Sequence, residues 1–249
     1  MKTINKKYLN LSNEMVKRLI LIGGGEIKSK TTREIDKYVA ELAKEHAEGK
    51  RAYGLFIGTA SHDSMPYFNS FRKTYTGDHD IKADCALTVY GEMNFEKIAA
   101  KFQKADFIYI GGGDTMFMLD KWQEFGLTKL VLDAYDRGVI VVGLSAGAIC
   151  FFENMYTDSF SRSGDEKYRF HQGLGLLKGT VSPHYDIRKP DFEQAMVDSG
   201  VLSALAIEGD SAVVYEDGVM KGAVSSGGKS YILRNNDGLI ERFEIENIR

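Results

Sequence analysis

Short apolar runs alternate with longer amphipathic stretches over the first 150 positions of the chain. The runs read as strands buried on both faces of a parallel sheet, and two of them, 19–25 and 106–113, end in three consecutive glycines. Between the runs, stretches such as 33–48 and 127–137 carry apolar residues at helical spacing. Strands that alternate with helices need crossover connections, so the pattern predicts an α/β fold with a mostly parallel, doubly wound sheet.

The pattern changes after about residue 155. Residues 156–173 are polar and irregular, and short β-like runs with hairpin turns at Asp217-Gly and Asp237-Gly follow, which predicts β-hairpins near the C-terminus. Predicted strands beyond those named above are 53–58, 85–90, 139–143, 179–181, 204–207, 212–215, 219–224 and 231–234. No Pro-rich linker or long charge run divides the chain, so we expect a single domain over 1–249.

Composition narrows the classes of partner. The chain has 249 residues, 43% of them hydrophobic, and 32 basic residues against 35 acidic ones give a formal charge of -3. This near-neutral balance argues against nucleic acid or an anionic membrane as a partner and favours a small molecule. Cys85 and Cys150 are too few for a disulfide framework or a zinc site, and no signal core or membrane span is evident. We therefore expect a cytoplasmic protein.

One strand end carries a candidate nucleophile. Gly143-Leu-Ser145-Ala-Gly147 matches Gly-x-Ser-x-Gly, in which a sharp strand-to-helix turn exposes the serine and the glycines relieve crowding. A predicted strand precedes the motif and a predicted helix follows it. The alternative is a serine that only caps a helix. The context favours Ser145 as a nucleophile.

A serine nucleophile needs a base and an oxyanion site. Downstream of the motif, His171 lies in the polar stretch, whereas His184 follows a predicted strand in Ser-Pro-His-Tyr, where it is the better base. The glycine turn 111–113 offers backbone N–H groups, so Gly113 and Ala146 are the predicted oxyanion donors. A phosphate-binding turn is the alternative.

The sequence does not single out the acid that would complete a catalytic triad. Asp158, Asp186, Glu208 and Asp210 are all candidate acids, because the sequence gives no distances.

Neither glycine-rich nucleotide motif fits. The stretch 23–28 lacks the last glycine of Gly-x-Gly-x-x-Gly, and 223–230 runs into a predicted strand where a phosphate-binding loop would open a helix.

The glycine turn with Asp114-Thr115, the Ser145 motif and Pro-His-Tyr, in this order, resemble the peptidase E family of aspartyl dipeptidases, which includes cyanophycinase. The resemblance covers about residues 19–215 and implies a three-layer α/β sandwich like that of class I glutamine amidotransferases. It also implies Ser145 as nucleophile, His184 as base, and Gly113 with Ala146 as oxyanion donors. For the acid it points to Glu208, which we favour, or to Asp158.

The chain departs from this family at the substrate side. The family commonly has Asn where Asp114 stands, which places a negative charge beside the substrate and weakens the case for an acidic one. A family arginine downstream of the histidine holds the substrate's Asp carboxylate; Arg188 is the nearest match, with Arg162 and Arg169 as alternatives. Asp114, Thr115 and Arg188 are thus the predicted substrate-binding residues.

The sequence therefore predicts a serine peptidase that hydrolyses short peptides, N-terminal aspartyl dipeptides above all, without metal or organic cofactor. A cyanophycinase-like β-aspartyl isopeptide hydrolase and a non-catalytic, amidotransferase-like binding module are the alternatives. A Cys150-centred amidotransferase is a weaker one, because Cys150 falls inside the helix after the motif. The N-terminal extension 1–18 and the tail from Gly218 exceed shorter family members, and we expect them to add an edge strand or a homodimer contact.

Overall fold

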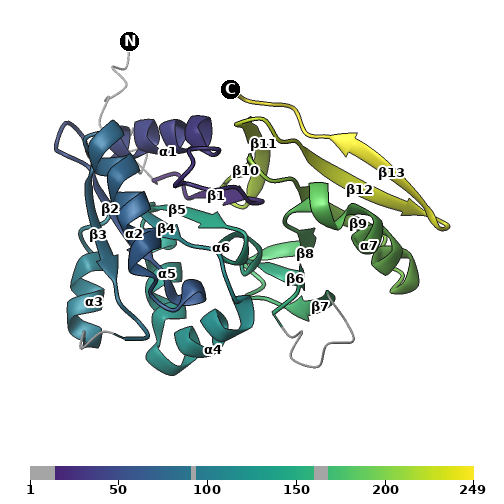
Figure 1. Cartoon of the computed structure of the whole chain (residues 1–249), viewed down its shortest axis with the longest axis horizontal. Coiled ribbons are helices and arrows are strands. Elements are labelled where there is room, and N and C mark those ends of the chain that lie inside the picture. The colour runs from purple at the N-terminus through teal and green to yellow at the C-terminus, as the bar shows by residue number, and fades with distance from the viewer. Residues whose placement is uncertain (1–14, 91–93, 160–167) are drawn as a thin grey trace, which may run out of the picture.

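Two β-sheets form the framework of the computed structural model, which describes residues 15–90, 94–159 and 168–249 (Figure 1). The larger sheet has the order β11-β10-β1-β5-β4-β2-β3, in which β1, β5, β4, β2 and β3 run parallel, β10 pairs antiparallel with β1, and the edge strand β11 pairs antiparallel with β10. Its strands are β1 (Arg18–Ile22), β2 (Tyr53–Ile57), β3 (Lys82–Ala86), β4 (Phe107–Ile110), β5 (Ile140–Leu144), β10 (Ser211–Glu216) and β11 (Val219–Ser225).

Helices cover both faces of this sheet. They are α1 (Arg33–His46), α2 (Met65–Arg72), α3 (Phe95–Phe102), α4 (Thr115–Phe125), α5 (Leu127–Asp136) and α6 (Ala146–Ile149), with a 3-10 turn at Thr59–Ser61 and a π-helical turn at Lys73–Asp78. The last helix, α7 (Tyr185–Asp198), packs on a second sheet. Alternate residues of each central strand point to opposite faces. Ile20 and Val142 pack under α1 and α2, whereas Leu21 and Val141 pack against α3, α4, α5 and α6. This arrangement is the predicted three-layer α/β sandwich.

A second sheet holds most of the strands after α6, including the predicted hairpin of β12 and β13 near the C-terminus. Its order is β13-β12-β9-β8-β6-β7, with strands β6 (Phe152–Thr157), β7 (Arg169–Gln172), β8 (Leu177–Ser182), β9 (Ser203–Ile207), β12 (Ser230–Asn236) and β13 (Leu239–Glu244). One face joins the main core through Val181 and Leu205, and the other packs on α7 through Ala206 and Phe192. The α6 helix lies between the two sheets (Figure 1), so the chain leaves the first sheet at the predicted nucleophile.

One predicted strand ends earlier than its apolar pattern suggests. The strand expected at 85–90 is β3, which stops at Ala86. Beyond it the backbone N–H groups of Thr88, Val89 and Tyr90 donate to the buried carboxylate of Asp63 and not to a neighbouring strand. The Asp63 side chain thus accepts the hydrogen bonds that a neighbouring strand would otherwise accept. The apolar pattern of 85–90 does not indicate such a contact.

The two chain ends differ from the expectations in detail. Most of the predicted extension 1–18 lies outside the described residues, and Arg18 already belongs to β1. The tail from Gly218 forms β11, β12 and β13, and β11 and β13 are edge strands of their sheets.

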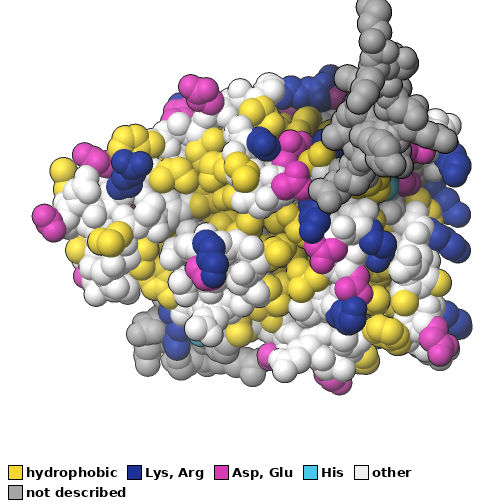
Figure 2. Space-filling model, turned by 180° about the vertical axis from the view of Figure 1, so that it is seen from behind, with side chains coloured by type: hydrophobic (Ala, Val, Ile, Leu, Met, Phe, Trp, Pro, Cys, Tyr) yellow, Lys and Arg dark blue, Asp and Glu magenta, His cyan; other side chains and the backbone are white. Residues whose placement is uncertain are grey.

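Seen from behind, the molecule carries a broad band of hydrophobic side chains bordered by charged ones (Figure 2).

Candidate active site

Ser145 occupies a strained turn between β5 and α6. Its φ of 50° and ψ of -108° are unusual for a residue with a side chain, and its N–H donates to the Ile22 carbonyl of β1 at 2.8 Å. A Cβ on Gly143 would stand 2.1 Å from the Gly147 carbonyl oxygen, and a Cβ on Gly147 would stand 2.3 Å from that of Ile110. Only glycine fits at either position, as the Gly-x-Ser-x-Gly pattern requires.

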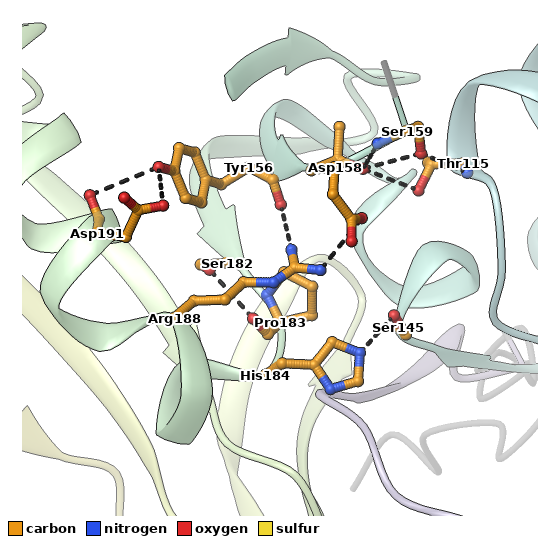
Figure 3. Close-up of polar contacts among 11 residues, drawn as sticks. Thr115, Ser145, Tyr156, Asp158, Ser159, Ser182, Pro183, His184, Arg188 and Asp191 are labelled. Atoms are coloured by element: carbon orange, nitrogen blue, oxygen red, sulfur yellow. Dashed lines mark hydrogen bonds and ion pairs between the residues drawn. The ribbon is translucent and has the colours of Figure 1, made fainter. Parts of the chain in front are cut away.

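His184 meets this serine from the other sheet. It follows β8 and precedes α7, and its Nε2 lies 2.8 Å from Ser145 Oγ (Figure 3). The backbone at His184 is left-handed, with φ 50°, and its N–H donates to Gly23 O at 2.9 Å. A Cβ on Gly24 would stand 2.4 Å from His184 Nδ1, so glycine is needed where the loop after β1 supports the ring.

The environment keeps this imidazole in its basic form. Burial lowers the pKa of His184, and the positive charge of Arg188 acts in the same direction, while Asp186 and Asp158 partly oppose them. A neutral Nε2 can accept the proton of the Ser145 hydroxyl. The pair therefore has the geometry and the protonation state of a nucleophile with its general base.

The glycine turn after β4 lies beside the serine. Gly112 lies against it, since a Cβ there would be 3.3 Å from Ser145 Cβ, and the turn is fixed by hydrogen bonds from Gly111 N to Ile57 O and from Asp114 N to Ala60 O. Within the described part of the chain, the N–H groups of Gly113 and Ala146 donate to no other residue. Neither predicted oxyanion donor is therefore engaged by another described residue.

Among the described residues, no carboxylate is hydrogen-bonded to the other ring nitrogen of His184. Glu208 accepts a hydrogen bond from Lys229 N at 2.9 Å, and Asp158 pairs with Arg188 at 3.3 Å (Figure 3). Asp186 accepts from Gly209 N at 2.8 Å, and Asp210 from the Thr31 hydroxyl at 2.5 Å. Among the described residues the arrangement is accordingly a Ser–His dyad, and Gly24 and the backbone orient the ring.

The predicted substrate-binding residues are held by the protein itself. Asp114 caps α4 by accepting from Phe117 N at 3.0 Å, and Thr115 is buried, with its N–H donating to Ser159 Oγ at 2.8 Å. Arg188, on the first turn of α7, donates to the Tyr156 carbonyl at 2.9 Å and stacks on the Tyr168 ring. Of the alternatives, Arg169 lies on β7 and Arg162 lies outside the described residues.

A pocket of about 400 Å³ opens beside the dyad. Sequence reasoning missed most of its wall, although the glycine run at the end of β1 marks a ligand-side loop. The lining residues are Gly25, Glu26, Ile27, Lys28, Pro66, Tyr67, Ser70, Gly112, Gly113, Leu144, Ser145 and His184. Its volume suits a small ligand such as a short peptide.

Cys150 does not share the exposure of Ser145. It follows the last residue of α6, is fully buried, and donates its thiol hydrogen to the Gly147 carbonyl at 3.3 Å. Burial raises the pKa of the Cys150 thiol well above its ordinary value. The structure therefore contradicts a Cys150-centred reaction.

The described part of the chain holds neither a metal-binding cluster nor a membrane-spanning helix. In residues 15–90, 94–159 and 168–249, no group of three or more His, Cys, Asp or Glu side chains is placed to hold a metal ion. Over the same ranges no helix is both long enough and apolar enough to cross a membrane.

Comparison with known proteins decides the family. Residues 19–222 match Peptidase family S51. The chain belongs to this family. The uncharacterized peptidase YgaJ of Bacillus subtilis strain 168 is 31% identical over 225 residues, which cover 87% of this chain and 91% of that protein. Peptidase E of Streptomyces coelicolor is 29% identical over 126 residues, 49% of each chain.

Solved structures agree on the fold. A peptidase from an acI-B1 Actinobacterium matches with a TM-score of 0.69 at 18% sequence identity, over 92% of this chain and 95% of that one. A putative peptidase E protein from Listeria monocytogenes matches with a TM-score of 0.59 at 19% identity, over 84% and 98%. The predicted resemblance to peptidase E is confirmed, and membership of family S51 makes the chain a peptidase of the serine type.

Proposed function

We propose that this S51 peptidase hydrolyses short peptides through Ser145 and His184, with N-terminal aspartyl dipeptides as its preferred substrates. The observation that carries the proposal is the 2.8 Å contact between Ser145 Oγ and His184 Nε2 at the mouth of a pocket. The unengaged N–H groups of Gly113 and Ala146 support it, because they can receive the charge that develops on the substrate oxygen.

The reaction proceeds in two halves. His184 Nε2 takes the hydroxyl proton as Ser145 Oγ bonds to the peptide carbonyl carbon, and the carbonyl oxygen becomes an oxyanion held by the Gly113 and Ala146 N–H groups. His184 then gives the proton to the departing amine, which breaks the C–N bond and leaves an acyl ester on Ser145. A water molecule, deprotonated by His184, attacks this ester, and the proton returns to Ser145 Oγ as the acid product leaves.

The preference for an acidic first residue rests on Arg188. Its guanidinium lies close enough to lower the pKa of His184, and its partner Asp158 is a half-exposed carboxylate at 3.3 Å, a long contact for such a pair. A substrate carboxylate that displaces Asp158 would keep the buried cation paired. For a third catalytic member, Glu208 stays our proposal and Asp158 the alternative; either carboxylate would have to leave its present partner to reach His184.

The test compares the wild type with Ser145→Ala on Asp-Leu, Glu-Leu, Ala-Leu and β-Asp-Arg. Ser199→Ala, a change at an exposed serine after α7, is the matched control. We expect fastest cleavage of Asp-Leu, a loss of several orders of magnitude in Ser145→Ala, and none in Ser199→Ala.

Other outcomes would redirect the proposal. Cleavage of β-Asp-Arg alone would assign an isopeptidase. Failure of the wild type to cleave any peptide, together with no labelling of Ser145 by a fluorophosphonate, would overturn the proposed activity and favour a binding role.

A further inference from the structure

The active-site pocket contains one carboxylate and one ammonium. Among its twelve lining residues, Glu26 and Lys28 are the only Asp, Glu, Lys or Arg side chains. Both stand on the loop that β1 delivers to the carboxyl edge of the sheet, next to Gly25, and both residues are exposed. The rest of the wall is glycine, apolar side chains and hydroxyls, apart from the catalytic imidazole, so these two charges dominate the recognition of a ligand.

The loop holds its acidic side chain in place. Glu26 N donates to the Thr31 hydroxyl at 2.9 Å, and one carboxylate oxygen of Glu26 accepts from Lys28 N at 3.2 Å. Burial raises the pKa of Tyr67 to about 12, and the negative charge of Glu26 contributes in the same direction. Glu26 and Tyr67 line the same pocket, and no described residue is hydrogen-bonded to the second carboxylate oxygen of Glu26.

The ammonium of Lys28 is uncommitted. Within the described ranges no hydrogen bond or ion pair joins it to another residue, whereas Lys30, two positions on, pairs with Asp78 at 2.7 Å. Lys30 lines a separate hollow near α1. A cation in a pocket without a partner is suited to an anionic group of the ligand.

A free dipeptide carries the complementary pair of charges. It has one ammonium at its first residue and one carboxylate at its second, on either side of the bond to be cut. Arg188, which we assign to the acidic side chain, is not part of this pocket wall, and in Figure 3 it lies across the Ser145–His184 contact from the loop after β1. The side-chain site and the terminal charges of the substrate thus have separate partners.

We propose that Glu26 binds the terminal ammonium and Lys28 the terminal carboxylate of the substrate, so that this loop selects short peptides with two free ends. The inference rests on the proposed peptidase function and extends it to the substrate class. Longer or blocked peptides lose at least one of the two contacts.

The test uses Glu26→Gln and Lys28→Met with three substrates: Asp-Leu, Asp-Leu with an amidated C-terminus, and Asp-Leu with an acetylated N-terminus. We expect the wild type to prefer free Asp-Leu over either blocked form by about ten- to a hundredfold in kcat/KM, the range of one charged hydrogen bond. Lys28→Met should lose the discrimination against the amide only, and Glu26→Gln that against the acetylated form only.

Charge-retaining and distant variants serve as controls. Lys28→Arg should restore the preference for the free carboxylate, and Lys37→Met, an exposed change on α1 outside this pocket, should alter none of the ratios. Thermal unfolding of each variant shows that it is folded.

Two results would overturn the inference while leaving the peptidase intact. One is an unchanged discrimination ratio in both Glu26→Gln and Lys28→Met, and the other is an equal loss on all three substrates. A wild type that cleaves none of the three would instead overturn the proposed function.

Discussion

At the scale of single residues, the site depends on two side chains in left-handed backbone. Ser145 and His184 both have φ near 50°, a conformation that costs free energy in any residue but glycine. Each is kept there by a backbone hydrogen bond to the loop that ends β1, Ser145 to Ile22 O and His184 to Gly23 O. The same strand end therefore aligns nucleophile and base, which come from different sheets.

The titration of His184 gives a residue-scale prediction. A base must be unprotonated, so kcat/KM falls as pH drops through its pKa, and because that pKa lies below the ordinary 6.5 we expect the acidic limb below pH 6.5. Asp158→Asn removes a charge that raises the pKa, so it should move the limb to lower pH with less than about a tenfold change in the plateau. The measurement is the pH profile of Asp-Leu hydrolysis.

Asp198→Asn, at the exposed end of α7, is the control and should leave the profile in place. A loss of several orders of magnitude in Asp158→Asn would contradict this prediction and identify Asp158 as the third triad member. In that case the Asp158–Arg188 pair would have to open during the reaction.

At the scale of elements, the junction of β5 and α6 tolerates no side chain beside Ser145. In Gly143→Ala the new Cβ would stand 2.1 Å from the Gly147 carbonyl, so the turn must shift. We expect peptidase activity to fall at least a hundredfold, because a displacement of about 1 Å at a nucleophile has this effect. The melting temperature should fall as well.

Gly77→Ala is the matched change, since a Cβ there meets nothing within 4 Å and the backbone is not left-handed. It should keep full activity and a melting temperature at or above that of the wild type. Wild-type activity in Gly143→Ala would show that the turn can relax, contrary to our expectation.

At the scale of the whole molecule, stability depends on a carboxyl buried between α1 and the π-helical turn. Asp36 accepts hydrogen bonds from Thr32 Oγ1 and Tyr75 OH, no ion pair joins it to another described residue, and burial raises its pKa from 3.8 to about 6. The folded state therefore favours the protonated form, and this stabilisation, about 3 kcal/mol in total, is present at low pH and lost as pH rises to 6.

Asp36→Asn removes this dependence. We expect the free energy of unfolding of Asp36→Asn, relative to that of the wild type, to rise by about 2 kcal/mol between pH 4.5 and pH 8. The rise is smaller than the full value of about 3 kcal/mol, about a third of which the wild type has already lost at pH 4.5. Urea unfolding at the two pH values measures it, and Asp120→Asn on the exposed side of α4 should show no such change. An equal offset at both pH values would mean that Asp36 titrates normally.

The sequence by itself determined the parts of this protein that local chemistry fixes. A glycine pattern around Ser145 is needed wherever a strand turns sharply into a helix, and His184 could be recognised because Ser-Pro-His follows a predicted strand. The parallel strands followed from apolar runs such as 53–58, which a strand buried on both faces requires.

Tertiary structure decided what depends on distance between segments. Three features bring together residues that are far apart in the chain. They are the division into two sheets, the pairing of Glu208 with Lys229 and of Asp158 with Arg188, and the position of Glu26 and Lys28 in the pocket of Ser145. A carboxylate has the same identity in the sequence whether it faces an imidazole, a backbone N–H or a guanidinium. Only the packing of the elements chooses among these partners, because hydrogen bonds and ion pairs act over a few ångströms.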